Sequence, residues 1–269
     1  KDIIVKEIEI PSYDGTMIPL SIIYSDKIKL DGKNPTIIEA YGAYGESLNS
    51  FFDLSKLVWL RAGGIYAIAH VRGGGEKGHK WYKAGFKATK ANSWKDFIAC
   101  SEYLIENKYT SPKKLSGKGT SAGGITVGRA ITERPDLYKA AVIEVGVLNA
   151  LRLENSRNNI NVAEWGTSKD SIEFNYLYGM DVYHHIKSNT EYPSLLITGG
   201  MLDSRVDIWQ PAKGVAKFQE VSYKKNNIVL FKINDYGHSG DIDAIKDISD
   251  IFSFLFWQLN VKFNCNEKF

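Results

Sequence analysis

The chain has 269 residues, of which 43% are hydrophobic and 24% are charged. This composition suits one sizeable core, and α/β folds of this length often form a single domain, here residues 1–269. The formal net charge of +3 comes without a basic run, so it gives no reason to expect a nucleic-acid partner. No apolar run approaches the length of a membrane span, and the N-terminus carries no signal-like segment.

The two cysteines, Cys100 and Cys265, lie far apart and have no ligand-like neighbours. This spacing supports neither a disulfide framework nor a zinc site. It suits a reducing compartment, so we expect a cytoplasmic location. Because the chain begins at Lys1 rather than at methionine, a signal removed upstream would make a periplasmic location the alternative.

The first elements in the chain are predicted to form an antiparallel hairpin. Residues 5–10 alternate apolar and polar side chains, residues 13–16 supply turn chemistry, and residues 17–24 are again rich in β-formers. Later strands read as nearly continuous apolar runs, which is typical of strands covered on both faces of a mostly parallel sheet. These runs are residues 36–41, 65–71, 140–146, 194–198 and 227–233.

Helical periodicity falls between these strands. The segments with an apolar stripe are residues 93–106, 122–132, 210–221 and 242–259. Alternating strands and helices predict an α/β fold in three layers, a mostly parallel twisted sheet with helices on both faces.

A glycine motif marks the candidate nucleophile. Gly119-x-Ser121-x-Gly123 matches the nucleophile elbow, a sharp strand-to-helix turn that holds the serine in a strained conformation where flanking side chains would clash. Gly117-x-Gly119-x-x-Ala122 also fits a permissive dinucleotide-binding fingerprint. That fingerprint normally opens its domain, whereas here it follows at least four predicted strands. An α/β-hydrolase-type serine hydrolase is therefore favoured.

A serine hydroxyl needs a base that a third group orients. α/β-Hydrolases present these groups in the order serine, acid, histidine, each on a loop after a strand. Asp203 follows the strand at 194–198 and His238 follows the strand at 227–233, with Asp207 as the main alternative acid. The remaining histidines fall in an apolar strand, a polar loop or a predicted helix: His70, His79, His184 and His185.

Several ordered motifs together resemble the catalytic domain of the prolyl oligopeptidase family of serine peptidases, including its oligopeptidase B branch. They are YGAYG at 41–45, HVRGGGE at 70–76, YTSP at 109–112, GTSAGG at 119–124, RPDL at 134–137, DSRV at 203–206 and GH at 237–238. The resemblance implies an α/β-hydrolase fold and hydrolysis of peptide bonds in short peptides, without a metal or organic cofactor. An esterase or amidase acting on small acyl substrates is the alternative function.

The resemblance also assigns roles by position. It gives the catalytic triad as Ser121, Asp203 and His238, and it gives the oxyanion hole as the Tyr41 hydroxyl with the Ala122 N–H. An arginine that holds a substrate carbonyl or carboxylate is matched by Arg205. The residues expected to line the first substrate pocket are Tyr44, Val147, Trp165 and Val206. The stretch that contains Arg72 and Glu76 is expected to be structural.

The specificity pocket departs from the family. The tryptophan that prolyl oligopeptidases stack on proline would fall near Asn161. The paired glutamates with which the oligopeptidase B branch holds basic residues would fall near Asn161 and Ala163, although Glu164 and residues 209–213 lean towards that branch. The sequence therefore does not predict the preferred residue. Family members also carry a β-propeller ahead of this region, so we expect one in the full-length chain.

Overall fold

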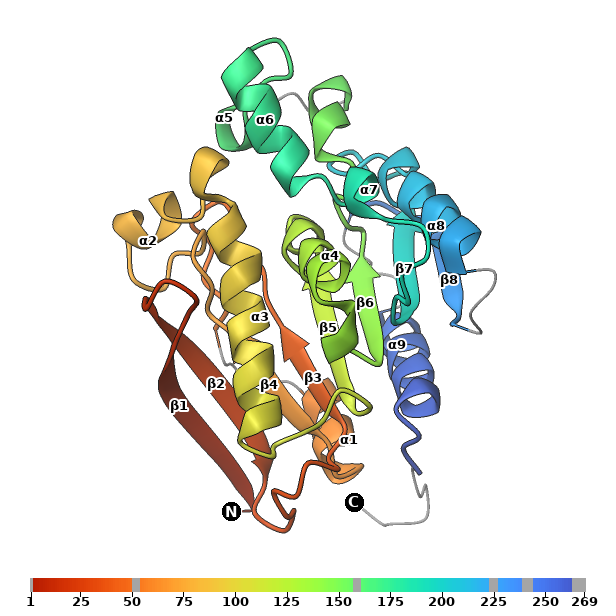
Figure 1. Cartoon of the computed structure of the whole chain (residues 1–269). Coiled ribbons are helices and arrows are strands. Elements are labelled where there is room, and N and C mark those ends of the chain that lie inside the picture. Colours follow the sequence, from red (N-terminus) through yellow and green to blue (C-terminus); the bar gives the residue numbers. More distant parts are fainter. Residues whose placement is uncertain (1, 50–53, 157–160, 223–226, 239–243, 263–269) are drawn as a thin grey trace.

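The computed structural model describes residues 2–49, 54–156, 161–222, 227–238 and 244–262. One eight-stranded sheet runs through them in the order β1-β2-β4-β3-β5-β6-β7-β8 (Figure 1). The strands are β1 (Ile3–Pro11), β2 (Met17–Ser25), β3 (Thr36–Glu39), β4 (Ile65–Ala69), β5 (Leu115–Thr120), β6 (Ala140–Glu144), β7 (Ser194–Gly200) and β8 (Val229–Asn234).

The direction of the strands agrees with the sequence prediction. β1 and β2 pair antiparallel from Ile3 opposite Ser25 to Pro11 opposite Met17, and β2 pairs antiparallel with β4. All pairs from β4 to β8 are parallel. The predicted α/β-hydrolase fold with an N-terminal antiparallel hairpin is therefore confirmed.

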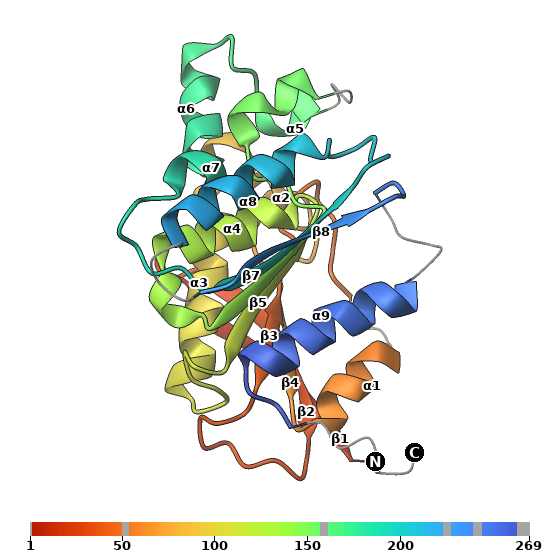
Figure 2. The ribbon, with the colours of Figure 1, turned by 90° about the vertical axis from the view of Figure 1, so that its right-hand side faces the viewer.

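Helices cover both faces of this sheet (Figures 1 and 2). α3, α4 and α8 lie on one face, and α1 and α9 lie on the other. The helices are α1 (Leu54–Arg61), α2 (His79–Lys83), α3 (Ala91–Glu106), α4 (Gly123–Glu133), α5 (Asn161–Trp165), α6 (Ser171–Met180), α7 (Val182–His185), α8 (Trp209–Ser222) and α9 (Ala244–Gln258). None of the helices in the described ranges is both long and apolar enough to span a membrane.

The two layers explain why the central strands are apolar at every position. Successive side chains of a strand point to opposite faces. In β4, Ile65, Ala67 and Ala69 join the core beneath α3 and α4, whereas Tyr66 and Ile68 join the core beneath α1 and α9. Because both faces are dry, neither set of alternate positions has to be polar.

The segment after β4 is structural, as expected. The Arg72 guanidinium, only 4% exposed, donates hydrogen bonds to the carboxylates of Asp96 and Asp14, and thereby ties the β1–β2 turn to α3. His70 is a buried core histidine whose Nε2 lies 2.7 Å from Ser21 Oγ. One local prediction is wrong: His79, expected in a polar loop, is the first residue of α2.

Candidate active site

Ser121 lies on the sharp turn between β5 and α4. Its φ of +55° is in the left-handed region, which costs a residue with a side chain about 1–3 kcal/mol. Two backbone hydrogen bonds hold this conformation, because the Ser121 N–H donates to Glu144 O (2.8 Å) and the Val147 N–H donates to Ser121 O (3.0 Å). The turn therefore presents the Ser121 hydroxyl at the carboxyl ends of the parallel strands.

The glycines around Ser121 are needed for close approach of the backbone. A Cβ at Gly119 would lie 2.5 Å from Gly123 O, and one at Gly123 would lie 2.7 Å from Ala40 O. Such contacts are far shorter than real carbon–oxygen contacts, so a side chain at either position would displace the turn. The spacing of this motif thus serves the elbow itself, as the sequence predicts.

His238 connects Ser121 with Asp203. The imidazole Nε2 lies 2.8 Å from Ser121 Oγ, and Nδ1 lies 2.7 Å from Asp203 Oδ2. The loops after β7 and β8 bring the two residues together, since these strands are parallel neighbours. Of the two candidate acids, it is Asp203 rather than Asp207 that contacts the imidazole.

The Asp203 carboxyl is held as a carboxylate. It is 2% exposed, and its Oδ1 accepts hydrogen bonds from the N–H groups of Arg205 (2.8 Å) and Val206 (2.9 Å). Burial acts to raise the pKa of Asp203, but the hydrogen bonds from His238 and these two N–H groups outweigh it and lower the pKa. A carboxylate at this position favours the tautomer with a proton on Nδ1, which leaves the Nε2 lone pair free to accept the Ser121 proton.

Tyr41 and Ala122 lie beside Ser121. Burial raises the pKa of the Tyr41 hydroxyl, and a hydrogen bond with Ser121 opposes that shift. Tyr41 therefore stays a neutral hydrogen-bond donor. Ala122 is the N-cap residue of α4, and its N–H donates to no other group within the described ranges. Both donors are available at the positions that the resemblance implied.

A cavity of about 670 Å³ opens in front of Ser121. Val147 and Val206, each 4% exposed, give it an apolar wall, and the exposed Arg205 adds a positive charge. Its lining residues are Tyr41, Tyr44, Glu46, Ser47, Leu48, Ser121, Ala122, Val147, Arg205 and Val206. Glu46, Ser47 and Leu48 had no signal in the sequence that would have assigned them to the site.

Trp165 lies behind Tyr44 and is not part of the described cavity wall. Its Nε1–H donates to the Tyr44 hydroxyl (3.0 Å), and the two rings pack edge to face with centroids 5.5 Å apart. With 1% of its surface exposed, Trp165 supports Tyr44 from the protein interior. Asn161 lies in α5, but its side chain is outside the described atoms.

Glu164 is also behind the cavity wall. It is 4% exposed, and its two oxygens accept hydrogen bonds from the Tyr44 N–H (2.9 Å) and the Tyr82 hydroxyl. The sequence had suggested Glu164 as a carboxylate for basic substrates. Its carboxylate is instead used to fix the Tyr44 loop from within.

Lys90 completes this buried layer and was missed from the sequence. It is 1% exposed, it donates to Gly42 O, and its Nζ lies 4.9 Å from the centroid of the Trp165 ring. Burial lowers the pKa of Lys90 to about 7, although the charge of Glu164 opposes the shift. Lys90 lies in a segment with several other lysines, so the sequence gives no signal that this one is buried.

The lowered pKa of Lys90 predicts a stability that depends on pH. In the unfolded chain the amine titrates near 10.5, so between pH 7 and 10.5 the unfolded state binds a proton that the folded state does not. Stability should therefore rise with pH across this window, by up to about 1.4 kcal/mol per pH unit. Thermal unfolding at pH 7 and 9 measures this. The stability of wild type relative to Lys90→Met should increase from pH 7 to pH 9, and the exposed Lys246→Met is the control. A constant difference between the proteins would contradict the assignment.

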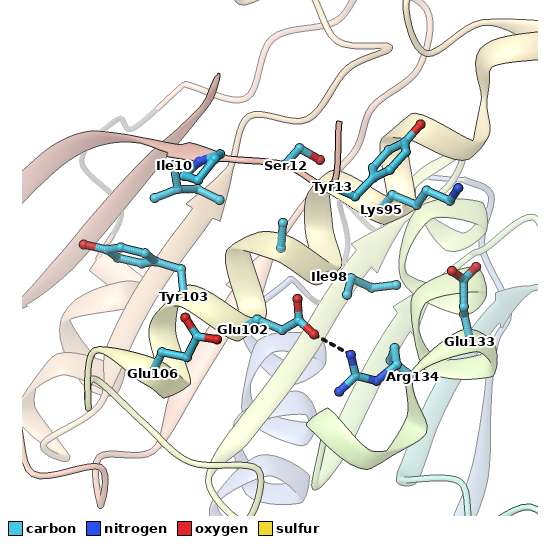
Figure 3. A pocket seen from close by; sticks show the side chains of 12 residues that line it. Ile10, Ser12, Tyr13, Lys95, Ile98, Glu102, Tyr103, Glu106, Glu133 and Arg134 are labelled. Carbon is cyan, nitrogen blue, oxygen red and sulfur yellow. Dashed lines mark hydrogen bonds and ion pairs between the residues drawn. The ribbon is translucent and has the colours of Figure 1, made fainter. Parts of the chain in front are cut away.

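A second cavity, of about 450 Å³, lies away from the active-site residues, between the hairpin turn and α3 (Figure 3). Glu102 and Arg134 on its wall form an ion pair, so their charges largely neutralise each other (Figure 3). The chemistry-bearing groups Ser121, Asp203 and His238 are not on its wall. The described residues also contain no cluster of three or more side chains suited to hold a metal ion.

The comparisons with known proteins agree on one family. The sequence pattern of the prolyl oligopeptidase family matches residues 50–262. The prolyl endopeptidase of Elizabethkingia meningoseptica is 39% identical over 256 residues, covering 93% of this chain and 36% of that protein. The chain thus spans little more than a third of the length of this relative and of the prolyl endopeptidase of Elizabethkingia miricola.

Solved structures agree with this match. A prolyl endopeptidase structure superposes with a TM-score of 0.94 at 37% identity, over 97% of this chain and 39% of that one. Oligopeptidase B from Leishmania major superposes with a TM-score of 0.90 at 32% identity, over 96% and 37% of the two chains. This chain therefore belongs to the prolyl oligopeptidase family.

Proposed function

We propose that this protein is a serine peptidase that hydrolyses peptide bonds in short peptides through an acyl-enzyme on Ser121. The observation that carries the proposal is the continuous connection from Asp203 through His238 to Ser121, with contacts of 2.7 and 2.8 Å. The family to which the chain belongs supports it, because named relatives are prolyl endopeptidases and a Protease 2. A non-catalytic role has no comparable observation in its favour.

The first half of the reaction is acylation. Ser121 Oγ attacks the carbonyl carbon of the scissile bond while its proton passes to His238 Nε2. The carbonyl oxygen becomes an oxyanion that accepts hydrogen bonds from the Tyr41 hydroxyl and the Ala122 N–H. The C–N bond then breaks, and the proton on Nε2 moves to the leaving amine.

The second half is deacylation. A water molecule gives its proton to Nε2 and attacks the ester carbonyl carbon, and the same two donors hold the new oxyanion. When the C–O bond to Ser121 breaks, Nε2 returns the proton to Oγ and the peptide acid leaves. Asp203 holds the imidazole and stabilises its charged form in both halves.

Substrate binding uses the cavity in front of Ser121. In this proposal Arg205 donates to a backbone carbonyl or carboxylate of the peptide, and the wall of Tyr44, Val147 and Val206 receives an apolar part of the substrate. Trp165 acts indirectly by fixing Tyr44. The β-propeller expected in the full-length chain stays a prediction.

Replacing Arg205 tests the peptidase function against the esterase alternative. Arg205→Ala should lower kcat/KM for extended peptide amides about 10- to 100-fold, because a hydrogen bond to a charged group is lost. It should leave hydrolysis of a small acyl ester nearly unchanged, since such an ester does not reach Arg205. Initial rates on both substrates, with the exposed Arg152→Ala as control, measure this. Equal losses on both substrates, or ester hydrolysis with no hydrolysis of any peptide, would favour the esterase.

A further inference from the structure

Glu46 reaches the wall of the active-site cavity through a fixed loop that follows β3. Gly42, Tyr44 and Gly45 all have left-handed backbone angles, with φ of +74°, +58° and +67°. The Glu46 N–H donates to Ala43 O (3.0 Å), and the Gly75 N–H donates to Glu46 O (3.3 Å). The backbone of Glu46 is therefore held from both sides, so its place on the cavity wall is set by the fold.

The glycine stretch 73–75 permits this arrangement. A Cβ at Gly73 would lie 2.2 Å from Gly42 O, and one at Gly75 would lie 2.1 Å from Gly45 O. Glu76 adds an anchor, since its Oε1 accepts a hydrogen bond from the Leu48 N–H (3.1 Å). The loop that bears Glu46 is thus packed directly on the stretch whose structural role the sequence predicted.

Two charges of opposite sign face the cavity. Of the described residues that line it, only Glu46 and Arg205 carry charged side chains. The Glu46 side chain is exposed, and in the described part of the chain its carboxylate has no hydrogen-bond or ion-pair partner. Glu164 does not compete for a ligand, because it is buried behind Tyr44 with both oxygens engaged.

Glu46 is also within electrostatic range of the oxyanion donor. Burial is the largest cause of the raised pKa of Tyr41, the charge of Glu46 adds to it, and the charge of Arg205 opposes it. The same field acts on any negative charge that forms beside Tyr41. An unneutralised Glu46 therefore disfavours the oxyanion, whereas a cation bound to Glu46 removes that penalty.

We propose that Glu46 is a specificity residue that binds a positively charged group of the substrate, an ammonium or guanidinium, close to the scissile bond. This inference rests on the proposed peptidase function. Arg205 and Glu46 then form two anchors of opposite charge, one for a substrate oxygen and one for a substrate cation. A neutral substrate leaves the negative charge of Glu46 without a counter-charge, and an acidic substrate is repelled by it. Glu46 therefore selects substrates through both affinity and turnover.

Turnover of matched peptides tests the inference. The substrates are N-acetylated peptides in which a single position carries lysine, norleucine or glutamate. That position is moved from two residues before to two residues after the scissile bond. A further norleucine peptide has a free N-terminus, which separates a basic side chain from an α-ammonium as the source of the cation. Rates are measured for wild type, Glu46→Gln and Glu46→Lys. Glu106→Gln, on the separate cavity of Figure 3, is the control.

The expected effects have opposite signs for different substrates. Wild type should prefer the cationic peptide to its norleucine analogue by about fivefold in kcat/KM, the scale of a solvent-exposed ion pair. Glu46→Gln should lose this preference, with lower rates on cationic peptides and higher kcat on neutral ones. Glu46→Lys should reverse it towards glutamate. A merely structural role would lower all rates by one factor, and that result would overturn the inference.

Peptide affinities of variants that lack the Ser121 nucleophile test the role of Glu46 independently of catalysis. The affinities of Ser121→Ala and of Ser121→Ala/Glu46→Gln for the lysine and norleucine peptides are measured by calorimetry. The single variant should bind the lysine peptide about fivefold more tightly, and the double variant should bind both alike. Equal affinities in the single variant would overturn the charge assignment even where turnover is normal. If no peptide is hydrolysed by wild type, the proposed function fails, and the binding comparison still decides the role of Glu46.

Discussion

Replacing Ser121 with alanine is expected to lower kcat for peptide hydrolysis by about a millionfold. The variant loses the atom that forms the acyl-enzyme, and only the oxyanion donors and substrate binding remain to accelerate attack by water. The measurement is the initial rate on a fluorogenic peptide at saturating concentration. Thermal unfolding of the variant should match wild type, because the turn is held by backbone hydrogen bonds of residue 121 rather than by its hydroxyl.

Adding a second substitution sharpens this result. His238→Ala alone should cost about as much as Ser121→Ala, and the double variant should lose little more, because the two groups act as one unit. The 2.8 Å contact between His238 Nε2 and Ser121 Oγ is the basis for this expectation. Losses that multiply in the double variant would mean that the two residues act independently, and the proposed mechanism would be wrong.

Asp203→Asn is expected to lower kcat about ten-thousandfold with little change in KM. An asparagine amide can donate to Nδ1, which favours the tautomer with its proton on Nε2. That nitrogen then cannot accept the Ser121 proton. Because Asp203 also accepts two backbone N–H bonds, thermal unfolding must be measured beside the rate.

Asp207→Asn is the matched control for Asp203, being the same change four residues further on. Asp207 is buried but does not contact the imidazole, so the variant should keep most of its activity once any loss of folded protein is corrected for. A larger loss in Asp207→Asn than in Asp203→Asn would transfer the acid role to Asp207.

The sheet and the elbow could be predicted from the sequence because their signals are local. Continuous apolar runs indicate strands with two buried faces, and the motif Gly119-x-Ser121-x-Gly123 ahead of an apolar helical pattern indicates the turn. Asp203 and His238 follow their strands directly, so strand order alone brings them to one edge. The dinucleotide alternative used the same glycines, but Gly119 is packed against the Gly123 backbone and Gly117 against the side chains of Val127 and Phe97.

The surroundings of the cavity could not be predicted because they depend on contacts between distant segments. Trp165 was expected on the cavity wall, yet it lies behind Tyr44, which the loop after β3 places in front of it. Lys90 and Glu164 meet in the interior from elements far apart in the sequence. Glu46 reaches the cavity only because three left-handed residues turn its loop and residues 73–75 lack side chains.

Glu164 does not replace the paired glutamates of the oligopeptidase B branch. Glu164 is engaged with the Tyr44 N–H and Tyr82, so its carboxylate is not offered to a substrate. Among the residues that the structure describes, the charges that face the cavity are Glu46 and Arg205, on loops after different strands. The proposal therefore places substrate selection at Glu46, and the Glu46 variants test it.

The most direct test of the proposed chemistry is to map the adduct of a fluorophosphonate, which phosphonylates an activated serine. Intact-mass analysis should show one adduct per chain, and peptide mapping should place it on Ser121. Labelling should be absent in Ser121→Ala and strongly slowed in Asp203→Asn. Equal labelling of wild type and Ser121→Ala, or an adduct on another residue, would contradict the assignment of Ser121 as the nucleophile.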